Sequence, residues 1–216
     1  ALGSYREVGR ACHLVTTNES RIMIDVGVNV ANDSDPMPYF NAPETLPIDK
    51  LDAVILTHAH LDHAGMLPVL FKYGYRGPVY CTHPTRDLML LLQTDYLKIG
   101  GAEGKRAPYS MEDIRTCQRH VVDVGWDQTI DIAPDVKMTF SNAGHILGSS
   151  AVHLHIGNGK HNLLFSGDSK YEKSWLFDAA NTRFPRVESL VLESTYGAAG
   201  DYQPSRHEAN QELQDI

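Results

Sequence analysis

The feature that most constrains this chain is a run of metal-ligand residue types at positions 57–63, which reads Thr-His-Ala-His-Leu-Asp-His. It directly follows an apolar run that is expected to form a buried strand. His58 and His60 are two positions apart, so at a strand end their side chains leave on the same face. Asp62 and His63 follow at the start of an expected helix, where the chain curls back toward that face.

Imidazole nitrogen and carboxylate oxygen are both zinc ligands, at distances of about 2.0–2.2 Å. Four such side chains in so short a run crowd a single tetrahedral ion, but they suit two ions about 3.5–4 Å apart. The alternative is an exposed polar loop without a ligand, which a few scattered histidines would favour. Because the cluster is dense and follows a buried strand, the sequence predicts a site for two metal ions.

Composition limits the remaining possibilities. The chain has 216 residues, of which 42% are hydrophobic and 21% are charged, as in one large or two small globular domains. No apolar stretch approaches the roughly 18 residues of a membrane span. The first residues have no basic lead and no apolar run, so we do not expect them to be a signal peptide. Because the chain starts at Ala1 without methionine, we expect it to be a piece of a longer protein. The chain has three cysteines, which cannot all pair with one another. We therefore expect them to be small, unpaired core residues of a protein in the reducing cytoplasm.

The net charge of −8 is the opposite of what a module that binds nucleic acid by itself carries. If the substrate is nucleic acid, metal ions must therefore offset the acidic charge, or basic groups outside this chain must bind it.

The order of expected elements predicts two sheets with helices packed outside. Strands are expected at 11–17, 21–28, 51–57, 78–82, 121–124, 128–132, 136–141, 151–156, 162–166 and 187–193. Helices are expected near 65–73, at 85–98 with Thr85 as N-cap, at 110–120, and from Ser205 onward. Residues 29–49 and 100–108 are expected to be loops.

The H-x-H-x-D-H pattern resembles the signature of the metallo-β-lactamase superfamily. The remaining motifs fall in the family's order: Asp25 precedes the pattern, and His145 and Asp168 follow it, each at the expected end of a strand or in a glycine-containing loop. The segment around Glu193 resembles the acidic motif of the β-CASP nucleases. With Glu7-Val8-Gly9-Arg10, it makes the chain most similar to archaeal homologues of the cleavage and polyadenylation specificity factor nuclease.

This resemblance implies an α/β fold, the four-layer αββα sandwich, over residues 1–203. Residues 204–216 would then begin a truncated β-CASP domain. It also implies a first zinc ion held by His58, His60, His145 and Asp168, and a second held by Asp62, His63 and the shared Asp168. Asp25 would orient a ligand or the reacting water, and Glu193 would support the acid that protonates the leaving group.

The function implied is a zinc-dependent RNA endonuclease of RNA 3′-end processing or transcription termination. A 5′-exoribonuclease like RNase J shares the same motifs, and a non-catalytic scaffold subunit is a further alternative. A thioester or lactam hydrolase is disfavoured by the segment from Glu193 to Gly197. RNA is the expected partner, no membrane is expected, and a homodimer would form through regions outside this chain. The isolated chain is expected to be weakly active.

The other histidines are expected to have ordinary roles. His153 and His155 alternate with Leu154 and Ile156, so they are expected on the polar face of a strand. His120 is expected at a helix end, where its charge favours the helix dipole.

Overall fold

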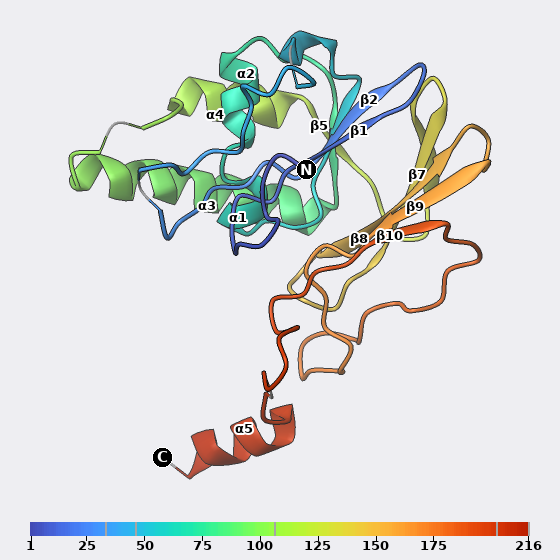
Figure 1. The fold of residues 1–216 in the computed structure, drawn as a ribbon. Helices are drawn as coiled ribbons and strands as arrows, with labels where there is room; N and C mark the ends of the chain where they lie inside the picture. The colour runs from blue at the N-terminus through green and yellow to red at the C-terminus, as the bar shows by residue number, and fades with distance from the viewer. Residues whose placement is uncertain (33, 46, 106, 202, 216) are drawn as a thin grey trace.

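The computed structural model describes residues 1–32, 34–45, 47–105, 107–201 and 203–215. They form two five-stranded sheets that lie face to face (Figure 1). The first sheet has the order β1-β2-β3-β4-β5, with strands His13–Thr16, Arg21–Ile24, Ala53–Ile55, Val79–Cys81 and Val121–Asp123. The second has the order β10-β9-β8-β7-β6, where β6 to β10 are Thr129–Ala133, Val136–Asn142, Ser150–Ile156, His161–Phe165 and Ser189–Val191.

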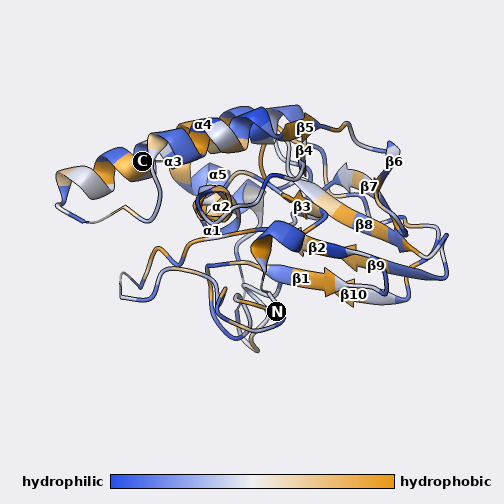
Figure 2. Ribbon diagram, turned by 90° about the horizontal axis from the view of Figure 1, so that it is seen from above, coloured by the Kyte–Doolittle hydropathy of each residue, from blue (hydrophilic) through white to orange (hydrophobic). Residues whose placement is uncertain are grey.

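Four helices belong to the first sheet, whose strands β2 to β5 are parallel. They are α1 (Leu61–Ala64), α2 (Leu67–Lys72), α3 (His83–Ala102) and α4 (Met111–Arg119). Parallel strands need crossover connections. The connection from β3 to β4 contains α1 and α2, and the connection from β4 to β5 contains α3 and α4. Figure 2 shows α3 and α4 side by side, and α4 also packs on α2.

Alternation along the central strands explains how the layers hold together. In β2, Ile22 and Ile24 point into a fully buried cluster between the sheets, which includes Phe140 of β7. Met23 of β2 and Val54 of β3 point the other way, into the cluster beneath the helices. The central strands β2 and β3 therefore bury both faces, as their largely apolar sequences require, whereas the edge strands β1 and β5 are partly exposed. The two-sheet α/β architecture expected from the sequence is confirmed.

Several boundaries differ from the expectation. The helix expected near 65–73 is two helices, α1 and α2, with Gly65 and Met66 between them. Thr85 is not an N-cap, because α3 begins at His83 after Thr82, and the Thr85 hydroxyl donates to the Gly148 carbonyl instead. α3 also extends to Ala102, into the loop expected at 100–108, and a short 3₁₀ helix η1 (Ile48–Lys50) interrupts the loop 29–49.

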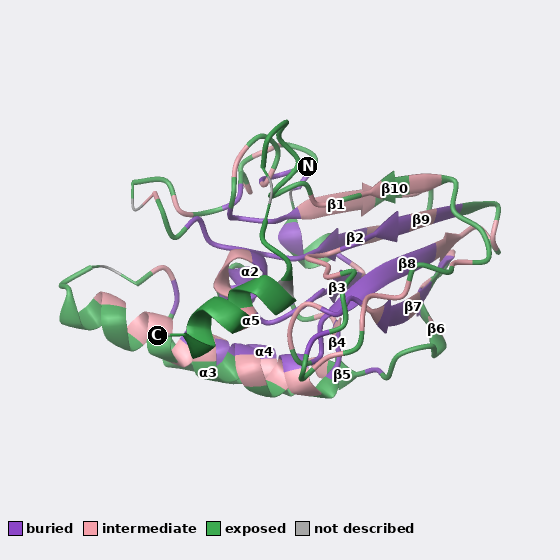
Figure 3. Cartoon of the chain, turned by 90° about the horizontal axis from the view of Figure 1, so that it is seen from below, coloured by how far each residue is buried: buried purple, intermediate pink, exposed green. Residues whose placement is uncertain are grey.

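The last helix, α5 (Arg206–Gln214), lies apart from both sheets at the end of an extended segment (Figure 1). Its Ser205 cap is the one expected from the sequence, since the Ser205 hydroxyl accepts a hydrogen bond from the Glu208 N–H. Figure 3 shows that its surface is exposed. Among the described helices, none is both long and apolar enough to cross a membrane.

Candidate metal centre

The histidine cluster lies where β3 ends and α1 begins. His58 follows β3 by three residues, His60 precedes the first turn of α1, and Asp62 and His63 lie within that turn. His58 is completely buried and His63 is 7% exposed. The tight packing depends on Gly27, because a Cβ there would lie 1.6 Å from the Asp62 carbonyl oxygen. The chain after β2 can therefore run directly against α1.

The first group of ligand-type side chains comes from three separate segments: His58, His60, His145 and Asp168. Nδ1 of His60 lies 3.1 Å from Nε2 of His58 and 3.2 Å from Nε2 of His145. Oδ2 of Asp168 lies 3.8 Å from Nε2 of His58 and 3.7 Å from Nε2 of His145. Ligands at tetrahedral corners around zinc are about 3.3 Å apart, given bonds of about 2.0–2.1 Å. The donor atoms therefore fit one tetrahedral ion.

The second group is Asp62, His63 and Asp168. Nε2 of His63 lies 3.7 Å from Oδ2 of Asp62 and 3.2 Å from Oδ1 of Asp168. Asp168 thus presents Oδ2 to the first group and Oδ1 to the second. Both ligand groups expected from the sequence are brought together, and one carboxylate joins them.

Asp25 lies behind this centre and holds two of its residues in place. Its carboxylate is 2.8 Å from Nδ1 of His63, and it accepts hydrogen bonds of 2.8 Å from both the N–H and the hydroxyl of Thr57. With Nδ1 of His63 bonded to Asp25, Nε2 faces Asp62 and Asp168. Such outer carboxylates fix the orientation of ligating histidines. Asp25 itself belongs to neither ligand group.

Thr57, which the sequence analysis did not single out, contacts both Asp25 and His58. Its hydroxyl lies between the Asp25 carboxylate and Nδ1 of His58, at 2.8 and 3.0 Å. It therefore orients a second histidine. Its position directly before the histidine pattern was the available signal.

The protonation of the histidines follows from their surroundings. Burial, reinforced by the neighbouring imidazoles, lowers the pKa of His58 well below its usual value, so its ring is neutral and can act as a ligand. Burial also lowers the pKa of His63, but the Asp25 and Asp168 carboxylates outweigh it and raise that pKa well above the usual value. The carboxylates of Asp25 and Asp168 therefore create a negative potential at His63, which favours binding of a cation there.

The residues contributed by the second sheet are held by special backbone geometry. Asp168 follows β9 directly after Gly167, whose φ of +54° lies in the left-handed region. A Cβ at Gly167 would lie 2.9 Å from the Thr57 side chain. The His145 N–H donates to the Ser149 hydroxyl at 3.1 Å, which ties the His145 loop to the start of β8.

Glu193 follows β10 and lies outside both ligand groups. Its Oε1 accepts from the Ser169 N–H at 3.4 Å and its Oε2 from the Thr195 N–H at 3.2 Å. Glu193 lines the same cleft of about 760 Å³ as Asp62, His63 and Asp168. A carboxylate at this place can act on a molecule in the cleft without coordinating the metal.

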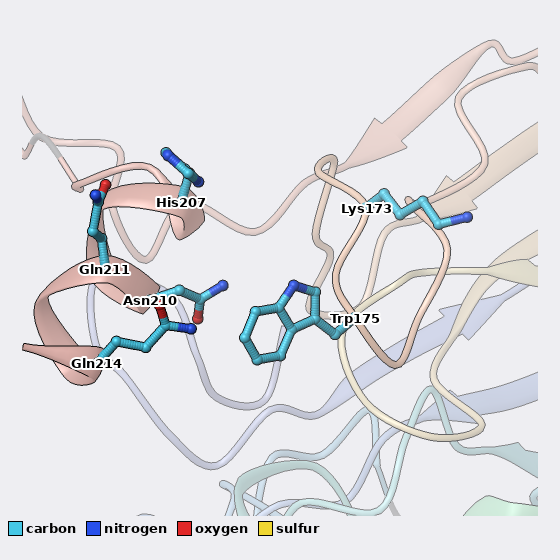
Figure 4. A pocket seen from close by; sticks show the side chains of 6 residues that line it. All are labelled: Lys173, Trp175, His207, Asn210, Gln211 and Gln214. Atoms are coloured by element: carbon cyan, nitrogen blue, oxygen red, sulfur yellow. The ribbon is translucent and has the colours of Figure 1, made fainter.

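A second hollow lies away from the centre, between the loop after β9 and α5 (Figure 4). Its volume is about 420 Å³, and it is lined by Lys173, Trp175, His207, Asn210, Gln211 and Gln214. None of these residues belongs to a ligand group.

The remaining histidines and the cysteines lie largely where the sequence predicts them. His153 and His155 lie on the outer face of β8, but His153 is only 3% exposed, because the Arg186 carbonyl accepts from its Nε2 at 3.0 Å and Phe184 packs on its ring. The polar face of β8 is therefore covered at His153 by Phe184 and Arg186. His120 caps the end of α4 as expected. The cysteines are buried and unpaired: Cys12, Cys81 and Cys117.

Comparison with known proteins gives a family. Residues 5–214 match the family described as the metallo-beta-lactamase superfamily. The chain is 55% identical over 214 residues to the transcription termination factor FttA of Methanosarcina mazei, covering 99% of this chain and 34% of that protein. It is 51% identical over 222 residues to FttA of Thermococcus kodakarensis, covering 100% of this chain and 34% of that protein. The chain thus spans about a third of the length of these curated relatives.

Among solved structures, the fold is similar to a protein of unknown function from Enterococcus faecalis V583. The TM-score is 0.54 at 17% identity, and the alignment covers 76% of this chain and 41% of that chain. The archaeal relatives agree with the archaeal resemblance expected from the motifs. With the family match over residues 5–214, the two-sheet fold and the His/Asp centre, the chain belongs to the metallo-β-lactamase superfamily.

Proposed function

We propose that this chain forms the metal-binding part of a zinc-dependent ribonuclease that cleaves RNA in transcription termination or 3′-end processing. The observation that carries the proposal is the position of Asp168, whose two oxygens face two different ligand groups. Two ions held by a shared carboxylate suit phosphodiester hydrolysis, because they clamp the attacking and leaving oxygens. The archaeal relatives are named transcription termination factors, which supports RNA as the substrate.

In this proposal His58, His60, His145 and Asp168 hold one zinc ion, and Asp62, His63 and Asp168 hold the other. When bound, the ions supply positive charge at the phosphate and lower the pKa of a water molecule from 15.7 to about 7. Asp25 keeps Nε2 of His63 facing the centre, and Thr57 does the same for His58. Glu193 supports the acid that protonates the leaving oxygen.

The positive charge of the ions also answers the acidic composition. The net charge of the chain is −8, but two divalent ions would carry +4 and would offset the carboxylates of Asp62 and Asp168 that hold them. Residues 1–203 would form the catalytic domain, and 204–216 the start of a second domain that contributes to RNA binding. A homodimer would form through regions beyond this chain.

The experiment is hydrolysis of a single-stranded RNA by the zinc-loaded chain and by the same chain after chelation. Copies of the RNA labelled at the 5′ end or internally separate the possible reactions. Zinc-dependent internal fragments support the endonuclease, whereas release of a labelled mononucleotide identifies a 5′-exoribonuclease. Binding of zinc without cleavage, in this chain and in the full-length protein, would contradict the proposal and identify a scaffold subunit.

A further inference from the structure

The cleft beside the metal centre is lined mainly by acidic and apolar side chains. Asp25, Asp62, Asp168, Glu7 and Glu193 all contribute to it. Among the lining residues that the structure describes, Arg6 alone carries a permanent positive charge. Apart from bound metal ions, Arg6 is therefore the one permanently cationic group among the described lining residues that could bind a phosphate of the substrate.

The loop that presents Arg6 is anchored by a second arginine, Arg10, which is 5% exposed. The Arg10 guanidinium donates to Glu7 at 2.7 and 2.9 Å and to Asp35 at 2.8 Å. It also donates to the hydroxyl of Tyr39 at 2.8 Å. Arg10 is thus fully used in holding the loop, and Glu7 is neutralised by it.

The other side of the loop packs toward the metal centre. The ring centroids of Tyr5 and His13 are 5.9 Å apart, and those of His13 and Phe165 are 5.3 Å apart. Phe165 ends β9, three residues before Asp168. This chain of contacts places Tyr5 and Arg6 along the wall of the cleft.

Arg6, unlike Arg10, has an exposed side chain with no hydrogen-bond or ion-pair partner among the described residues. Its backbone is also unusual, since φ is +69° at Ser4 and +61° at Arg6 but not positive at Tyr5 between them. Left-handed conformations at residues other than glycine are costly and cluster at functional sites. Alternation of this kind turns successive N–H groups toward one side, where they bind anions. Within the described chain, the N–H groups of Tyr5, Arg6 and Glu7 have no acceptor.

We infer that Arg6 and the adjacent N–H groups bind a substrate phosphate next to the one that is cleaved. This inference rests on the proposed function and narrows its substrate to a polynucleotide, because a single phosphodiester has no neighbouring phosphate. Arg6 is then a substrate-binding residue that takes no part in the metal centre.

The first test measures binding of a fluorescein-labelled 2′-O-methyl RNA octamer to the zinc-loaded chain at several salt concentrations. The intact length of the octamer is checked on a gel after each titration. Arg6→Ala is compared with Arg183→Ala, which removes the same charge from an exposed position outside the cleft lining. We expect Arg6→Ala to weaken binding about fivefold and to lower the salt dependence by about 0.7, the value of one single-strand phosphate contact. Arg183→Ala should change neither quantity.

The second test uses bis(p-nitrophenyl) phosphate, a diester with one phosphate. Arg6→Ala should lower kcat/KM for RNA about fivefold and should lower kcat/KM for this diester much less, because the diester has no neighbouring phosphate for Arg6 to bind. If neither the wild-type chain nor the full-length protein hydrolyses either substrate, the proposed function fails, and the binding test still decides the role of Arg6. Equal affinity and salt dependence in wild type and Arg6→Ala, or no RNA binding by the wild-type chain, overturns the inference.

Discussion

The two oxygens of Asp168 distinguish the metal positions at the level of single atoms. Oδ2 faces His58 and His145, whereas Oδ1 faces His63. The first group offers four ligand-type side chains and the second offers three, so the two zinc ions of the proposal would be held with different affinities. Zinc prefers four ligands, and the second ion would complete its shell with water.

Asp168→Ala should therefore remove zinc from both positions, because the shared carboxylate is lost. His145→Ala should mainly empty the first position, since His145 belongs to that group alone. The check is zinc per chain by elemental analysis after dialysis, with circular dichroism to confirm folding. Two tightly bound ions in Asp168→Ala would show that the ligand assignment is wrong.

Glu193→Gln tests a different role at the same scale. The amide keeps the size of the side chain and one acceptor oxygen but cannot exchange a proton at neutral pH. RNA turnover should fall by about 10²–10⁴-fold, the usual contribution of proton transfer. Zinc content should stay near that of the wild type, because Glu193 lies outside both ligand groups. Loss of zinc in this variant would place Glu193 among the ligands.

At the scale of elements, two helices begin with the same capping arrangement but contribute differently to stability. In both α4 and α5 the N-cap serine accepts from the N–H of the third helical residue, and that residue's carboxylate accepts in return. α4 buries Ile114 and Cys117 against the core, whereas the surface of α5 is exposed. The two helices have the same N-terminal capping motif, but only α4 packs against the core.

Ser110→Ala should lower the free energy of unfolding by about 1 kcal/mol, as expected for loss of an N-cap. Ser205→Ala, which removes the same type of cap from α5, should cause no resolvable change. Fraying of an unpacked helix precedes global unfolding and does not contribute to it. Urea unfolding of both variants is the measurement, and equal destabilisation would show that α5 unfolds together with the sheets.

At the scale of the whole molecule, the fold shifts the pKa values of two histidines outside the metal centre in opposite directions. Burial beneath residues 184–188, aided by His155, lowers the pKa of His153. His83 is exposed, and its hydrogen bond to Asp123, together with the charge of Asp87, raises its pKa. The protonated form is therefore disfavoured by folding at His153 and favoured at His83.

For the zinc-loaded chain, stability linked to His153 should be complete above about pH 6.5 and decline as the pH falls toward its lowered pKa. Stability linked to His83 should be present below about pH 6.5 and be lost as the pH rises through its raised pKa. His153→Gln keeps a donor for the Arg186 carbonyl but does not titrate, so its stability should fall less between pH 7 and 5. Urea unfolding across pH measures this, and NMR titration should place the two pKa values on opposite sides of 6.5.

If His153 titrates above 6.5, the outer face of β8 is solvated, and residues 184–188 do not cover it in solution.

The sequence by itself determined the features that depend on near neighbours. The cluster at 57–63, the strand that begins at Arg21 and the helices that begin near Ser110 and Ser205 all follow from patterns over a few residues, because strand and helix periods act locally. Motif resemblance added Asp25, His145, Asp168 and Glu193 as members of the site.

Only the tertiary structure decided how these residues meet. Which oxygen of Asp168 faces which histidine, and the bridging of Asp25 to His58 by the Thr57 hydroxyl, depend on the packing of two sheets. The burial of His153 depends on a segment about 30 residues further along. Thr85 does not cap α3, because its hydroxyl donates to the distant Gly148 carbonyl. Such contacts join segments far apart in sequence, and no local period encodes them, because they form only when the sheets pack together.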